Sequence, residues 1–161
     1  MVEPRTSPVN SLLRFALVGC ILAIAACGDS TRSTESLSRA EEQFAQKNYN
    51  EAIVELKIAL DAANEQQEEL PQARWMLGKS YLETGNMVAA AKELERANQL
   101  GWNPNEVLPA LAKALLSKGE LEQVMTLSTA GLDPQAAAQL QAQQALAQLG
   151  QGDIWTADTY I

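Results

Sequence analysis

The sequence predicts an all-α protein in which helix hairpins stack side by side. Beyond residue 36 the chain is dominated by Ala, Leu, Gln and Glu, which are helix-favouring residues. Its small residues and turn residues also recur at a fixed spacing, with one unit starting near Pro71 and the next near Asn105, 34 positions later. One helix hairpin cannot bury its apolar face, so the repeat predicts an α-solenoid with one shared core.

The first 26 residues are expected to lie outside this solenoid, as a secretory signal. Arg5 and Arg14 give a modestly basic start, and residues 15–26 form an apolar run that ends in small residues. A helix that crosses a bilayer needs about 20 apolar residues, more than this run supplies. We therefore expect residues 1–26 to be a cleaved signal peptide. An uncleaved N-terminal anchor is the alternative, and either would export the rest of the chain.

The end of this segment, Ala25-Ala26-Cys27, resembles the lipobox of bacterial lipoproteins. The resemblance implies that a lipid is attached to the Cys27 thiol and that acyl chains hold the protein on a membrane. By resemblance to known sorting rules, Gly28 after the cysteine favours the outer membrane over the inner one. Cleavage would also remove Cys20, so no internal disulfide is expected. The small polar residues over 27–36 predict a flexible tether.

The repeat domain is expected over residues 37–161, with repeats at about 33–66, 71–104 and 105–137 and a partial one at 138–161. These units resemble tetratricopeptide (TPR) repeats. The second unit matches best, through Leu77, Gly78, Tyr81, Gly85, Asn86, Ala90, Leu94 and Ala97. Gly78 and Ala90 are small residues on neighbouring helices, which would allow the two backbones to approach closely.

The last unit is incomplete, and this predicts an exposed apolar end. Ile154, Trp155, Tyr160 and Ile161 would lack the rest of their helix and a polar cap. Terminal repeats normally present a polar outer face. We therefore expect association or poor order at the C-terminus.

Repeat solenoids bind partners along a concave surface that is built by the first helix of each unit. The resemblance implies that this surface carries Leu37, Glu41, Phe44 and Ala45, then Gln72, Trp75, Lys79, Leu82 and Glu83, and then Glu106, Lys113, Leu116 and Ser117. The partner-binding groove is expected to consist of Phe44, Trp75, Lys79, Leu82, Glu83, Lys113 and Leu116. Trp75 is the central candidate, and its alternative role is packing between hairpins. Trp102 is expected to pack in a turn between repeats.

The residues that support most enzyme and cofactor chemistry are missing from the sequence. The chain has no histidine, and Cys27 is the only cysteine expected in the mature protein. It also has no Gly-x-Ser-x-Gly or phosphate-binding glycine motif. We therefore expect neither catalysis nor a metal or other cofactor. Glu65, Glu68 and Glu69 could suggest a cation site or a paired-carboxylate catalyst, but no flanking residue fixes their geometry, so we interpret them as a solvated loop or helix end. The net charge of −8 argues against a nucleic-acid partner, since phosphates would be repelled.

The stretch from Ala73 to Asn86, continuing to Ala112, resembles the N-terminal part of the TPR lipoproteins of the PEP-CTERM/exosortase system. Those proteins carry a lipobox signal and many repeats, and they accompany protein sorting and exopolysaccharide export in Gram-negative bacteria. The resemblance implies a lipid-anchored scaffold that faces the periplasm and binds a protein or peptide segment. Family chains are longer, so this one would be a truncated gene, a fragment or a shortened relative. The alternatives are a general outer-membrane or cell-wall assembly lipoprotein and a carbohydrate-binding module.

Overall fold

The computed structural model describes residues 28–157, so the expected signal peptide, the lipidation residue Cys27 and residues 158–161 lie outside the described part. Over that part the chain forms helices only, which confirms the all-α class. They are α2 (Gly28–Ala45), α3 (Tyr49–Glu65), α4 (Pro71–Glu83), α5 (Met87–Gln99), α6 (Pro104–Lys118), α7 (Leu121–Thr126) and α8 (Pro134–Ala157).

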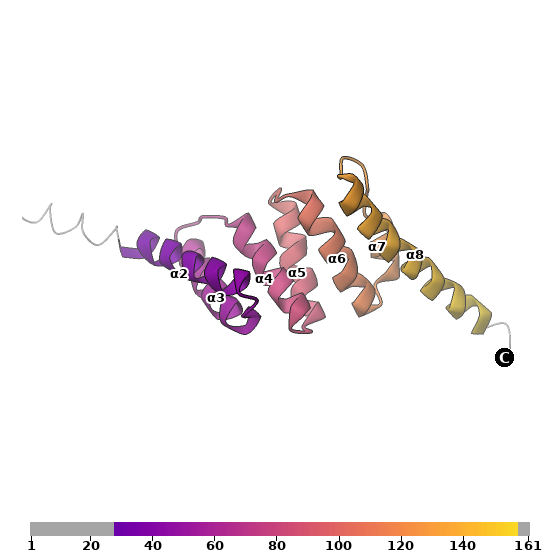
Figure 1. Cartoon of the computed structure of the whole chain (residues 1–161), viewed down its shortest axis with the longest axis horizontal. Helices are drawn as coiled ribbons and strands as arrows, with labels where there is room; N and C mark the ends of the chain where they lie inside the picture. Colours follow the sequence, from indigo (N-terminus) through magenta and orange to yellow (C-terminus); the bar gives the residue numbers. More distant parts are fainter. Residues whose placement is uncertain (1–27, 158–161) are drawn as a thin grey trace, which may run out of the picture.

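The helices form an elongated row that follows the order of the sequence. Figure 1 shows α2 and α3 at one end of the row and α8 at the other. Each helix packs against its neighbours in the chain, and α8 packs against both α6 and α7. Most tertiary contacts therefore join segments that are close in sequence, as in an array of hairpins.

The first hairpin begins earlier than the sequence predicts. The region expected to be a tether, 27–36, is helical from Gly28 onward. The Ser33 hydroxyl donates a hydrogen bond to the carbonyl oxygen of Ala59 in α3 at 3.3 Å, and Ser36 is fully buried. Small polar side chains can lie in a helix interface when the hydroxyl has an acceptor there. The composition of residues 27–36 therefore predicts a linker, whereas the structure has the start of α2 there.

The second hairpin, α4 and α5, has the turn and the close approach that the sequence predicts. A Cβ atom added to Gly78 would lie 2.6 Å from Cγ of Leu94, so α4 and α5 approach closely at this point. Gly85 in the connecting turn has φ +85°, a left-handed conformation that glycine adopts without strain. The side-chain oxygen of Asn86 then accepts a hydrogen bond from the backbone N–H of Ala89 and caps α5.

The region beyond α6 departs from the predicted units. Helix α7 has only six residues, and the backbone becomes extended at Leu127. Helix α8 begins at Pro134, not at 138, and continues through Gly150 and Gly152 to Ala157. Glycine inside a helix costs only about 1 kcal/mol relative to alanine, which packing elsewhere along the helix can offset. The predicted apolar end, Ile154, Trp155, Tyr160 and Ile161, lies outside the described side chains.

The core consists of two clusters of small and aliphatic residues. One lies between α2, α3 and α4 and includes Leu56 and Met76, and the other runs from α4 to α8 and includes Leu94 and Leu140. Trp75 and Tyr81 of α4 pack against both clusters. Helix α4 therefore joins the two core clusters, and Trp75 lies between them.

Candidate functional site

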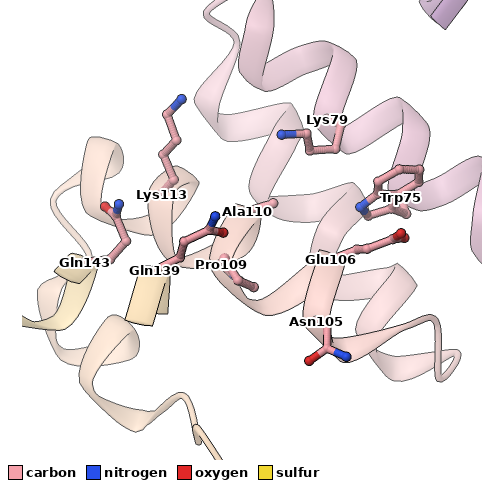
Figure 2. Close-up of a pocket in the computed structure, with 9 residues that line it drawn as sticks. All are labelled: Trp75, Lys79, Asn105, Glu106, Pro109, Ala110, Lys113, Gln139 and Gln143. Atoms are coloured by element: carbon pink, nitrogen blue, oxygen red, sulfur yellow. The ribbon is translucent and has the colours of Figure 1, made fainter. Parts of the chain in front are cut away.

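An open pocket lies beside Trp75, where α4, α6 and α8 meet. Its volume is about 380 Å³. The lining residues are Trp75 and Lys79 from α4, Asn105, Glu106, Pro109, Ala110 and Lys113 from α6, and Gln139 and Gln143 from α8. Figure 2 shows these side chains around the pocket, with the two glutamines on the side opposite Trp75.

The lining residues lie on one face of each helix because they recur every fourth position. Trp75 and Lys79 are four apart on α4, as are Gln139 and Gln143 on α8. Residues at this spacing project from the same side of an α-helix. On α6 the same spacing includes Pro109, which has no N–H to donate to the carbonyl four residues earlier. Three helices thus each contribute a regular stripe to one concave surface.

Trp75 forms the aromatic wall of the pocket. Its ring lies 5.5 Å from the Phe44 ring and 6.1 Å from the Trp102 ring, measured between centroids. Phe44 in turn contacts Tyr49 edge-on at 5.8 Å. Contacts of this kind contribute about 0.5–1.5 kcal/mol each beyond area burial. Trp75 therefore packs between elements and also lines the pocket. Its role in binding a partner stays a prediction.

The indole nitrogen of Trp75 has no hydrogen-bond acceptor among the described residues, although it is buried. Such an unsatisfied donor costs about 1–3 kcal/mol in an apolar setting. Trp102 differs, since its Nε1 donates to a carboxylate oxygen of Glu106 at 2.8 Å. That bond fixes Glu106 at the edge of the pocket beside the tryptophan pair.

The polar part of the pocket combines two lysine ammonium groups with three side-chain amides and the Glu106 carboxylate. Lys79 lies 3.7 Å from Glu83 on the next turn of α4, a partly exposed ion pair. Lys113 is exposed, and no salt bridge joins it to another described residue. Together with the side-chain amides of Gln139 and Gln143, these lysines can donate to carbonyl or carboxylate oxygens of a ligand.

The structure brings together three of the groove residues expected from the sequence: Trp75, Lys79 and Lys113 line the pocket. Phe44 supports Trp75 from behind without lining the pocket. Leu82 is only 4% exposed and belongs to the core, so it offers a partner almost no surface. The remaining two do not line the pocket. Glu83 is exposed, and Leu116 is partly buried and packs against the core.

Sequence reasoning did not identify five of the lining residues: Asn105, Pro109, Ala110, Gln139 and Gln143. The first two could have been found by stepping back four residues at a time along α6 from Lys113. Gln139 holds the place in the unit from 138 that Gln72 and Glu106 hold in the second and third units, so the same correspondence could have found it. Gln143 corresponds to neither Trp75 nor Lys79 in that unit, whose predicted start at 138 falls inside one continuous helix.

The acidic residues after α3 do not form a site. Glu69 pairs with Arg96 of α5, and Glu68 is exposed. Among the side chains that the structure describes, no group of three or more from His, Cys, Asp or Glu is placed to hold a metal ion. Over the same residues, none of the helices combines the length and apolar character that crossing a membrane requires.

Comparisons with protein-family models, with curated proteins and with solved structures gave no match for this chain.

Proposed function

We propose that this chain is a scaffold of TPR-like helix hairpins that binds a segment of another protein in the pocket beside Trp75. The pocket carries the proposal, because successive hairpins contribute matching stripes to one concave surface. The close crossing at Gly78, the turn at Gly85 and the in-order packing of the helices support a solenoid of TPR type. A cavity of about 380 Å³ accommodates a few side chains of an extended peptide.

The ligand segment should present oxygen acceptors beside an apolar group. Lys113 and the glutamines of α8 supply donors, whereas Trp75, Pro109 and Ala110 supply apolar surface. An acidic or carbonyl-rich peptide with one bulky side chain matches this combination. The carbohydrate-binding alternative is less well supported, because Phe44 and Trp102 contact the indole on which a sugar would stack.

The proposed cellular setting is the envelope of a Gram-negative bacterium, with Cys27 carrying the lipid. It rests on the lipobox resemblance and on the resemblance of residues 73–112 to TPR lipoproteins of the PEP-CTERM/exosortase system. We propose a role in the protein sorting and exopolysaccharide export that those lipoproteins accompany. The alternative is assembly of other outer-membrane or cell-wall machinery, which would use the same pocket and anchor.

Site-specific photo-crosslinking in living cells tests the pocket. A photoreactive amino acid at Gln143 should give a discrete crosslinked protein, and one at Lys57 of α3, an exposed residue outside the pocket, should not. Lys113→Glu should reduce the Gln143 product about tenfold or more, because it reverses the charge that faces the ligand. Equal products at both positions, or a Gln143 product unchanged by Lys113→Glu, would contradict the proposal.

The anchor is tested separately with Cys27→Ser. We expect this variant to lose metabolic labelling by palmitate and to leave the membrane fraction. Labelling and fractionation like those of the unaltered protein would show that Cys27 is not the lipidated residue.

A further inference from the structure

Helix α8 has apolar residues on two opposite faces, and only one of them is covered. Ala136, Leu140 and Ala147 are buried against the rest of the protein. The opposite face carries a second stripe that is exposed, which we call the outer stripe: Ala138, Ala142, Ala145, Leu146 and Leu149. Leu146 is 52% exposed and Leu149 is 68% exposed. A surface helix normally has a polar outer face, whereas one that is apolar all round is covered by another element.

The outer stripe also lies in the longest uncharged part of the described chain. Pro134 to Gly152 contains no Asp, Glu, Lys or Arg, although the chain as a whole has a net charge of −8. Two copies of an acidic protein repel each other across most of their surface. Along α8 that repulsion is weakest, and no charge has to be desolvated when the stripe is covered.

The opposite end of the row is unsuitable as a partner for this stripe. The exposed residues of α2 include Arg32, Glu35, Arg39, Glu41 and Glu42. Arg39 already pairs with Glu35 and with Glu55 of α3, and its hydrogen bond to Glu55 raises the pKa of Arg39 above its ordinary value. Covering these groups with the outer stripe would desolvate charges without giving them new partners. Head-to-tail stacking of copies is therefore disfavoured.

The outer stripe is complementary to itself when two copies of α8 run antiparallel. A two-fold axis that passes between Gln143 and Gln144 places Ala138 of one copy opposite Leu149 of the other. The same axis places Ala142 opposite Ala145. A large residue thus meets a small one at each end, and small residues meet in the middle, where the helices would approach most closely. A surface that matches itself in this way forms a closed, isologous interface.

We propose that the outer stripe of α8 is the interface of a two-fold symmetric dimer of this chain, with the two α8 helices antiparallel. One helix pair is a small interface, so the dimer should be weak, with a dissociation constant in roughly the micromolar range. Helix α8 also supplies Gln139 and Gln143 to the pocket, so dimerisation joins two pockets in one assembly. A bivalent partner would then bind more tightly through effective concentration.

The first test is the molar mass of the whole chain in a mild detergent, measured by size-exclusion chromatography with light scattering over a range of concentrations. We expect a concentration-dependent dimer. Leu149→Glu should weaken it at least tenfold, because two carboxylates would be placed in an apolar interface. The matched control is Val88→Glu, since Val88 is 69% exposed on α5, and it should leave the dimer intact.

A monomer at all concentrations, an open-ended series of larger species, or equal effects of the two glutamate variants would overturn the proposal. Circular dichroism checks that the variants keep their helix content. If Leu149→Glu lowers it, Leu149→Gln replaces that variant, because glutamine removes the apolar contact without adding a charge.

The second test is disulfide crosslinking, which reports the direction of pairing. In a chain with Cys20→Ser and Cys27→Ser, the double variant Ala138→Cys/Leu149→Cys should form a covalent dimer on mild oxidation. The two positions are about 16 Å apart along one helix, too far for a bridge within one chain. Each single cysteine variant should crosslink poorly, because identical positions are far apart in an antiparallel pair. Efficient crosslinking of the single variants, or none with the double variant, would refute antiparallel pairing through this stripe.

Discussion

Replacing Gly78 by alanine should destabilise the protein, although alanine is the better helix former. Gly78 lies inside α4, where the exchange alone would stabilise by about 1 kcal/mol. The added Cβ would, however, lie 2.6 Å from Cγ of Leu94 and 3.1 Å from the backbone nitrogen of the same residue. Neither atom is the free end of a side chain, and Leu94 is fully buried. The helices must therefore move apart, and overpacking of this kind costs about 1–3 kcal/mol.

An overpacking cost of about 2–3 kcal/mol exceeds the gain of about 1 kcal/mol in helix propensity. The net loss of stability is then about 1–2 kcal/mol, which lowers the thermal midpoint by roughly 5 °C. Thermal unfolding followed by far-ultraviolet circular dichroism measures it. The matched control is Gly150→Ala in α8, where the nearest atom to the new Cβ is a terminal methyl of Leu121 at 3.1 Å. Leu121 is partly exposed and can rotate away. Gly150→Ala should therefore leave the midpoint unchanged or raise it.

A double-mutant cycle with Leu94→Ala isolates the contact. Removing the leucine side chain alone creates a cavity that costs about 2–5 kcal/mol. The alanine methyl at position 78 would fill part of that cavity, so the double variant should be more stable than the sum of the single changes predicts, by about 1 kcal/mol or more. If Gly78→Ala raises the midpoint as Gly150→Ala does, or if the cycle is additive, the close approach of α4 and α5 does not depend on Gly78.

Three further changes test other parts of the fold. Glu93→Gln should cost about 1–3 kcal/mol in unfolding free energy, because Arg74, whose Nη1 lies 2.8 Å from the Glu93 carboxylate, would stay partly buried without a negative charge beside it. Gly119→Ala should cost about 1 kcal/mol, because residue 119 ends α6 with φ +79°. Gln144→Ala should speed amide hydrogen exchange in α7 with little effect in α4, because the Gln144 amide donates to two carbonyls at the end of α7.

The second hairpin could be predicted from sequence because its signals are local. Pro71 starts a helix, Gly85 and Asn86 form a turn, and the apolar residues between them follow a helical spacing. The beginning of α2 could not be predicted in this way. Ser33 and Ser36 look like linker residues until α3 is in place to cover them, and the acceptor for Ser33 lies 26 residues away. That interaction is tertiary and leaves no local pattern.

The candidate site also combines features that local sequence patterns predict with features that depend on tertiary packing. Trp75, Lys79 and Lys113 could be found because they occupy one stripe on the first helix of each unit. Leu82 lies on the same stripe as Trp75, but it packs in the cluster that α6 completes, and α4 contacts α6 directly. Which part of a stripe stays open is decided by the neighbouring helix, and the spacing of residues on one helix carries no information about that.

Helix α8 forms the side of the pocket opposite Trp75, and the Gln144 side chain joins α8 to the end of the short helix α7. A helix leaves its last carbonyls without intrahelical donors, and α7 ends after six residues. The Gln144 side chain donates to the carbonyl oxygens of Val124 at 3.3 Å and Leu127 at 2.8 Å, and so ties α8 to this end. Gln143, the next residue along α8, lines the pocket. Gln144→Ala should therefore also lower photo-crosslinking from Gln143, although Gln144 itself is not among the lining residues. An unchanged Gln143 product in this variant would show that packing of α8 on α6 alone positions the wall.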